Sequence, residues 1–127
     1  MPDVAFYALM RFVPDLERGE PINVGALAGS NDQLVVRIAG ESNVLAEVDI
    51  VRRFAELLNY LIDAERDDAG QLDVQGFLHR LAYRRFSHFS ITEPRQVMFG
   101  GSAEALAGRV IQALAAHPAA SEQLLPI

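Results

Sequence analysis

Hydrophobic residues alternate with polar or small ones in three early segments, at residues 4–13, 22–28 and 33–39. This period of two is typical of β-strands, in which alternate side chains point to the same side of a sheet. One face of the first segment is formed by Phe6, Ala8, Met10 and Phe12. One face of the second is formed by Ile22, Val24, Ala26 and Ala28. The pattern predicts three strands, of which the first two form a hairpin.

Three later segments carry hydrophobic residues at helical spacing. We expect two helices at about 50–66 and 73–85, and a third that begins after residue 102 and ends before Pro118. Three residues have the side-chain oxygens and the positions of N-terminal helix caps, namely Asp49, Asp73 and Ser102. The two central helices should lie next to each other, because both need a hydrophobic sheet surface to cover.

The remaining segments complete the predicted order. Residues 86–92 alternate and indicate a fourth strand, residues 96–101 read as an extended connector, and residues 40–48 are irregular. The predicted order is βββααβα, an α+β fold with a largely antiparallel sheet and helices packed on one face. We expect one domain over residues 1–127, with residues 118–127 as a C-terminal tail.

Composition narrows the function classes. The chain has 127 residues, no cysteine and a net charge of −6, and its basic residues are all arginine. An acidic chain disfavours general nucleic-acid binding, which depends on neutralising phosphates. No apolar run approaches the roughly 20 residues of a membrane span, and the N-terminus lacks signal-peptide features, so we expect a cytoplasmic protein.

No metal or cofactor is expected. The three histidines, His79, His88 and His117, have no histidine partner at helical spacing, and no cysteine is present. No phosphate-binding loop, dinucleotide fingerprint or nucleophile motif is recognisable either. The sequence therefore predicts no catalytic residue.

The hairpin formed by the first two strands contains the strongest candidate site. Matching the hydrophobic faces of these strands places Arg11 and Asn23 together on the opposite face, beside Gly25. Glu20 and Arg18 are predicted to lie at the rim of that face. Arginine can bind a carboxylate or a phosphate through two parallel hydrogen bonds.

Two interpretations of this cluster remain open. Arg11 can be bonded internally to Glu20 or Asn23 and so stabilise a long hairpin loop. Alternatively, Arg11, Glu20 and Asn23 form a binding site for an anionic or nucleotide-like group. The arrangement of these side chains, in an open pocket or under cover, separates the two.

A weaker anion site is conceivable before the last helix. Gly100, Gly101 and Ser102 lead into its N-terminus, where free amides favour anions, and Arg95 is close in sequence. The simpler interpretation is a glycine turn followed by a serine cap. Arg84 and Arg85 are expected at the end of the second helix, where cations are favourable.

The segment from Tyr7 to Gly25 reads Y-x-L-M-R-F-V-P-D-x-x-R-G-E-x-x-N-V-G. It resembles the opening signature of the bacterial and phage family called domain of unknown function 3037. The resemblance extends to "FSITEPRQV" at 89–97 and "AEALAGRVIQAL" at 103–114. The signature residues are Arg11, Pro14, Arg18, Gly19, Glu20, Asn23, Gly25 and Pro94. Ala26 and Ala28 stand where bulkier aliphatic residues are usual, which suggests a shorter or looser second strand.

The resemblance implies no catalytic role for these residues, because the family has no established function. Family members are sometimes encoded near a kinase that resembles the HipA toxin, so the resemblance implies another protein, such as a HipA-like kinase, as the partner. Because the sequence contains no recognisable nucleophile–base pair, metal cluster or cofactor fingerprint, our first hypothesis is a non-enzymatic protein-interaction or regulatory module. The alternative is a small enzyme or ligand-binding domain that uses Arg11, Glu20 and Asn23.

Overall fold

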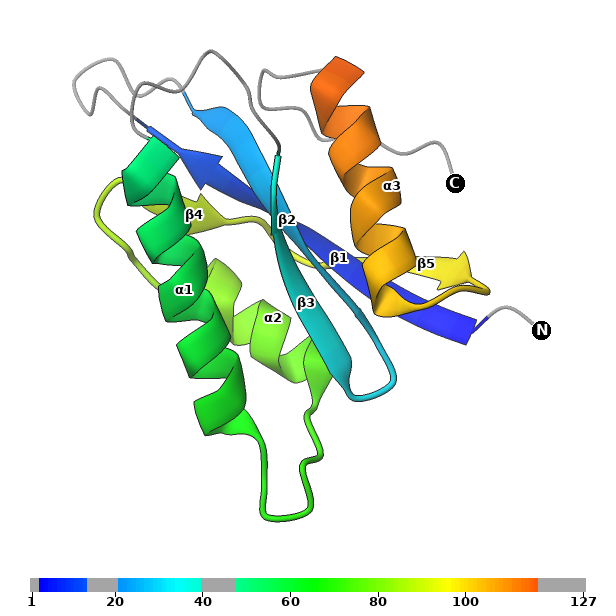
Figure 1. The fold of residues 1–127 in the computed structure, drawn as a ribbon. Helices are drawn as coiled ribbons and strands as arrows, with labels where there is room; N and C mark the ends of the chain where they lie inside the picture. The colour runs from blue at the N-terminus through cyan, green and yellow to red at the C-terminus, as the bar shows by residue number, and fades with distance from the viewer. Residues whose placement is uncertain (1–2, 14–20, 40–47, 117–127) are drawn as a thin grey trace.

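The computed structural model describes residues 3–13, 21–39 and 48–116 (Figure 1). The strands are β1 (Asp3–Phe12), β2 (Ile22–Ser30), β3 (Gln33–Ile38), β4 (Phe89–Ile91) and β5 (Arg95–Phe99). The helices are α1 (Val48–Glu65), α2 (Val74–Ala82) and α3 (Ala103–Ala116). The α+β class and the predicted order of the first three strands and the helices are confirmed.

The five strands form one antiparallel sheet with β1 at its centre. The order from one edge is β3-β2-β1, and both β4 and β5 pair with the remaining side of β1. The prediction of an extended connector at 96–101 was wrong for most of that segment, because residues 95–99 form β5. Its apolar residues gave no clear alternation, and only pairing with β1 makes this segment a strand.

Thr92 joins β4 to β5 along the side of β1. Its backbone N–H donates to the Leu9 carbonyl oxygen at 3.0 Å, and its hydroxyl accepts from the Leu9 N–H at 2.8 Å. The side chain therefore satisfies a backbone group of β1 where the two short strands meet. Pro94 follows, and as a residue without an N–H it separates β4 from β5.

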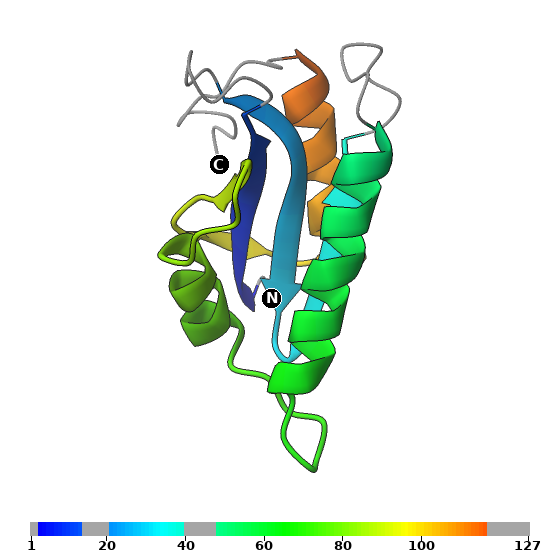
Figure 2. The ribbon, with the colours of Figure 1, turned by 90° about the vertical axis from the view of Figure 1, so that its left-hand side faces the viewer.

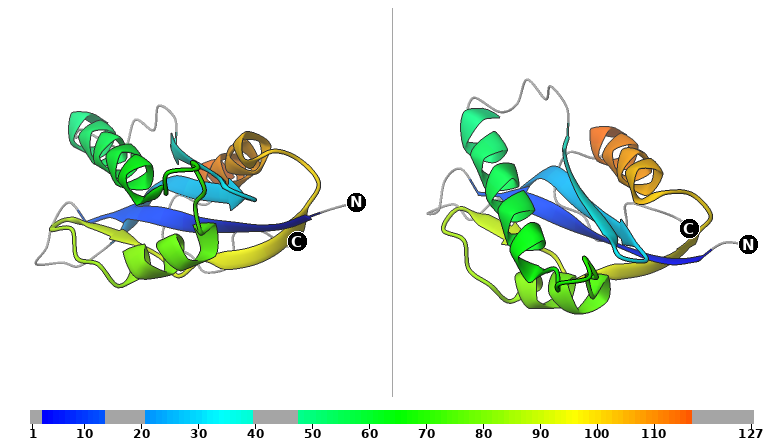
Figure 3. Two further views of the ribbon diagram at one scale, coloured as in Figure 1. Left: turned by 90° about the horizontal axis from the view of Figure 1, so that it is seen from below. Right: turned by 60° about the horizontal axis from the view of Figure 1, so that its bottom comes forward.

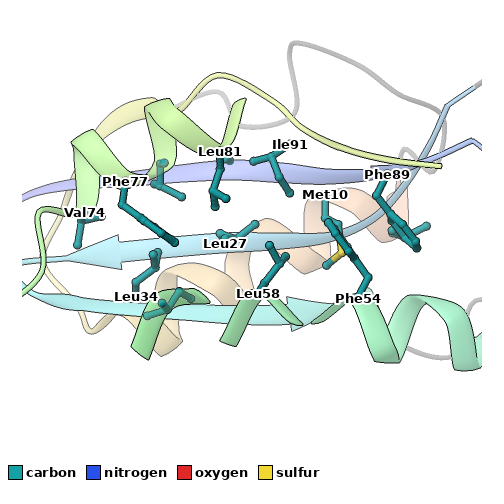
Figure 4. Close-up of a cluster of buried hydrophobic side chains, with 14 of the residues drawn as sticks. Met10, Leu27, Leu34, Phe54, Leu58, Val74, Phe77, Leu81, Phe89 and Ile91 are labelled. Carbon is teal, nitrogen blue, oxygen red and sulfur yellow. The ribbon is translucent and has the colours of Figure 1, made fainter. Parts of the chain in front are cut away.

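One face of the sheet is covered by α1 and α2, as predicted. Figure 2 shows the two helices in front of the sheet, with α3 behind it. The core between them contains large side chains, and Phe54 of α1 stacks on Phe89 of β4 with ring centroids 4.1 Å apart (Figure 4). Further members of this core are Met10, Leu27, Leu34, Leu58, Val74, Phe77, Leu81 and Ile91.

The third helix, α3, lies on the other face, so the expectation that the helices share a single face was wrong for it. Its buried residues Leu106, Ala107, Val110 and Leu114 pack on small residues of the sheet. Those residues include Ala5, Ala26 and Ala28, which are fully buried. Small side chains let a helix approach the sheet closely, and this explains the alanines of β2, which continues to Ser30 rather than being short or loose.

Two of the three predicted helix caps are confirmed. Asp73 Oδ1 accepts from the Gly76 N–H at 3.1 Å, and Ser102 Oγ accepts from the Ala105 N–H at 3.1 Å. Asp49 is not a cap, because α1 begins one residue earlier at Val48. A shift of one residue at a helix end is within the normal uncertainty of sequence patterns.

Candidate functional site

The hairpin prediction that placed Arg11 beside Asn23 is confirmed. The two residues are direct partners across β1 and β2, and Arg11 Nε donates to Asn23 Oδ1 at 3.3 Å. Asn23 is buried, with 5% of its surface exposed, and Arg11 is half-buried. Phe12 lies in the core on the opposite face, as expected. Arg18 and Glu20 fall outside the described residues.

A bulge in β2 changes the predicted face pattern beyond Asn23. Arg11 pairs with Asn23 while Met10 pairs with Gly25, so Val24 is an extra residue in β2. Ile22 and Val24 face the α1–α2 core, as predicted, but Ala26 lies under α3. Beyond the bulge each side chain is on the face opposite to the one that strict alternation predicts.

Gly25 therefore does not lie beside Arg11 and Asn23, and that part of the prediction was wrong. A Cβ atom at Gly25 would be 2.5 Å from the Arg37 carbonyl oxygen and 2.7 Å from Met10 Cε. The space next to Gly25 is filled by a neighbouring strand and by a core side chain. Glycine is required here for close packing within the sheet rather than for the approach of a ligand.

Two further polar residues lie next to Arg11, namely Ser90 on β4 and His88 on the turn before β4. Ser90 is the direct partner of Arg11, and Val13 N–H donates to the His88 carbonyl oxygen at 2.8 Å. His88 Nδ1 donates to the Val13 carbonyl oxygen at 2.7 Å, since a carbonyl can only accept. These bonds hold the end of β1 between β2 and β4, where Arg11 projects.

Tyr7 and Arg95 lie further along the same sheet face. They are direct partners across β1 and β5, and Tyr7 is buried. Burial raises the pKa of the Tyr7 hydroxyl, and the charge of Arg95 lowers that pKa by a smaller amount. The buried phenol is therefore neutral at physiological pH.

The weaker anion site is divided by the structure. Arg95 begins β5 and Gly100 follows its end, so the two are separated by about 16 Å of extended chain. The hydroxyl of Ser102 caps α3, and Glu104 in the first turn forms an ion pair with Arg37 of β3. Arg95 therefore does not join Gly100, Gly101 and Ser102 in one site.

Sequence reasoning missed a polar cluster on α2 and the segment after β4. His79 Nδ1 lies 3.1 Å from Glu93 Oε2, and the rings of His79 and Tyr83 are 5.2 Å apart. A hydrogen bond from the Tyr83 hydroxyl to Glu93, together with the charge of that carboxylate, raises the pKa of Tyr83. His79 lies on α2 and Tyr83 is the C-cap of that helix, four residues later, but nothing in the sequence indicated Glu93 as their partner.

The described residues contain no group of three or more histidine, cysteine or carboxylate side chains that could hold a metal ion. No helix among them is long and apolar enough to cross a membrane. His117 lies outside the described residues.

The fold and the site define a small α+β protein. Its antiparallel sheet has two helices on one face and one on the other, and an arginine–asparagine pair lies at the hairpin. The sequence matches the family described as protein of unknown function, DUF3037, over residues 7–115, and the chain belongs to that family. No curated protein and no solved structure matches the chain. The binding of an anionic or nucleotide-like group by Arg11, Glu20 and Asn23 stays a prediction.

Proposed function

We propose that this protein is a non-enzymatic protein-interaction module with a regulatory role, and that its partner binds along β5. The observation that carries the proposal is an exposed apolar pair beside an edge strand. Val4 of β1 and Met98 of β5 are direct cross-strand partners, with 42% and 52% of their surfaces exposed. Among the described residues, β5 pairs with β1 alone.

The two apolar side chains lie at an end of the sheet, on the face that α1 and α2 leave uncovered there. Val4 points to the same face as Phe6, whose ring packs against the α1–α2 core. Two other side chains of β5, Val97 and Phe99, pack against the core under α3. β5 is thus anchored on one face and presents Met98 on the other.

An edge strand has backbone N–H and C=O groups that a further strand can bind. Partner segments that add to a sheet edge gain affinity from these groups and specificity from side-chain contacts. An extended apolar segment of a partner protein would bind the backbone of β5 and cover Val4 and Met98. Exposed apolar groups next to such an edge are typical of interaction sites.

A kinase that resembles HipA is the proposed partner. This part of the proposal rests on the resemblance of the signature residues to a family whose members are sometimes encoded near such a kinase. We infer that binding to β5 would regulate that kinase. The test is co-purification of the tagged protein with a HipA-like kinase after co-expression, with affinity measured by calorimetry.

The variant Met98→Arg should abolish co-purification, because a charge at the centre of the apolar pair would be buried without a partner. Leu57→Arg is the matched control, since Leu57 lies on α1 with 43% of its surface exposed. Both variants should fold normally because they change exposed side chains. The proposal fails if the kinase binds Met98→Arg as well as the original protein, or if both variants lose the kinase equally.

A further inference from the structure

A pocket lies between the end of α2 and the start of β4, outside the β5 edge. Its volume is about 590 Å³, within the range of about 300–1,000 Å³ that is typical of small-molecule sites. The polar and aromatic residues that line it are Tyr83, Arg84, Arg85, Phe86, Ser87 and Ser90. We refer to it as the α2–β4 pocket.

Two arginines that are consecutive in the sequence line this pocket and give it a positive charge in an acidic protein. In the parts of the chain that the structure describes, no carboxylate forms an ion pair with Arg84 or Arg85. The nearest acidic group in the neighbouring cluster, Glu93, is bonded to His79 and to the hydroxyl of Tyr83. The charge of the two arginines is therefore available to a ligand.

Two carbonyl oxygens at the end of α2 are satisfied by the backbone and not by these guanidinium groups. The last helical carbonyl oxygens accept backbone hydrogen bonds, from the Tyr83 N–H to Arg80 and from the Arg84 N–H to Leu81. The Arg84 guanidinium instead lies over the ring of Phe86, 5.2 Å from its centroid. This contact restricts Arg84 at the wall of the pocket.

Ser87 adds an independent observation, because its backbone is in an unfavourable conformation. It has a φ of +53°, in the left-handed region that favours glycine. It lies in a turn closed by a hydrogen bond of 2.8 Å from the Phe89 N–H to the Phe86 carbonyl oxygen. A strained residue with a hydroxyl group at a pocket wall is typical of a functional site, where the side chain matters more than the backbone preference.

We propose that the α2–β4 pocket binds the phosphate group of a small phosphorylated molecule. Arg84 and Arg85 would each donate to phosphate oxygens, as arginine does in charge-assisted pairs. A phosphomonoester has a charge of about −1.5 to −2 near neutral pH, which matches two guanidinium groups. The hydroxyls of Ser87 and Ser90 would donate to the remaining oxygens.

The test is isothermal titration calorimetry of the full chain with AMP, ribose 5-phosphate and adenosine. The first two probes should bind and adenosine should not, because the site recognises the phosphate. Equal affinities for AMP and ribose 5-phosphate would assign recognition to the phosphate alone. Tighter binding of AMP would add a contact between the base and the exposed ring of Tyr83. The absence of binding by both phosphate probes at millimolar concentration would overturn the proposal.

Variants of the arginines locate the site. Arg85→Gln should weaken binding about ten- to hundredfold, because a hydrogen bond to a charged group is lost. Arg109→Gln is the matched control, since Arg109 is an exposed arginine on α3. Equal weakening in both variants would indicate a general charge effect and would overturn the proposal, as would unchanged binding by Arg85→Gln.

Ser87→Gly separates backbone strain from binding. Glycine adopts a positive φ without cost, so the melting temperature should stay the same or rise. The hydroxyl is lost, so AMP should bind several-fold more weakly. If Ser87→Gly binds AMP as tightly as the original protein, Ser87 has no role as a donor and the proposed ligand set is wrong.

Discussion

The two edges of the sheet differ in how they are covered. At one edge β3 lies between α1 and α3, and both helices contact it, as the two views in Figure 3 show. At the other edge β4 and β5 pair with β1, and β4 is contacted by α2 and by Phe54 of α1. The exposed pair Val4–Met98 and the α2–β4 pocket both lie at this second edge.

This difference between the edges suggests that one edge serves mainly stability and the other mainly binding. The edge at β3 is covered on both faces, because Leu34 and Val36 pack towards α1 and α2 while Val35 packs under α3. The edge at β4 and β5 leaves backbone, apolar and charged groups accessible, and such groups carry binding in small domains. Substitutions at the two edges should therefore have unequal effects on the free energy of unfolding.

The largest expected difference is between Leu106→Ala and Met98→Ala. Leu106 of α3 is fully buried, so its truncation should lower the free energy of unfolding by about 2–5 kcal/mol. Met98 is exposed, and its truncation should change that free energy by about 0.5 kcal/mol or less. Urea denaturation measures both. Similar losses would show that β5 is packed as tightly as the covered edge.

A smaller effect is expected for Gly25→Ala, because the added methyl group would overlap with the Arg37 carbonyl oxygen and with Met10. The loss should be about 1–3 kcal/mol. Gly108→Ala is the matched control, since Gly108 is in α3 and a Cβ there has no neighbour within 4 Å. That control should gain about 0.5–1 kcal/mol. A loss in both variants would contradict the packing argument.

Asn23→Ala tests the pair at the centre of the sheet, between the two edges. Removing the acceptor of the Arg11 hydrogen bond should lower the free energy of unfolding by about 1 kcal/mol. Asn23→Asp keeps an oxygen at the same position and should lose less. If both variants are as stable as the original protein but a phosphorylated probe binds less well, the pair belongs to a binding site instead.

The smallest effect is expected for the ion pair between Arg37 and Glu104, which joins β3 to α3. Both side chains are about half exposed, so a double-mutant cycle should give a coupling of roughly 0.2–1 kcal/mol that falls as salt is added. The pair between Arg80 and Glu65, which has similar exposure, should behave alike. A coupling well above this range would mean that the ion pair itself helps to close the β3 edge.

The sequence alone determined the local features of this protein. Periodicity located three helices and the first three strands, because the spacing of apolar residues follows the geometry of each element. Asp73 and Ser102 were identified as caps, since a cap depends on contacts within a single turn. The pairing of Arg11 with Asn23 was also predicted, because both lie close to the loop of one hairpin.

The tertiary structure decided what depends on contacts between distant segments. The bulge at Val24 reversed the faces of β2 beyond it, so Gly25 and Ala26 were assigned to the wrong faces. Pairing with β1 made residues 95–99 a strand, and the choice of face for α3 followed from the small alanines beneath it. Glu93 meets His79 across 14 residues, and the α2–β4 pocket forms where a helix end meets a turn. Such contacts depend on the packing of whole elements, which the period of a single segment does not encode.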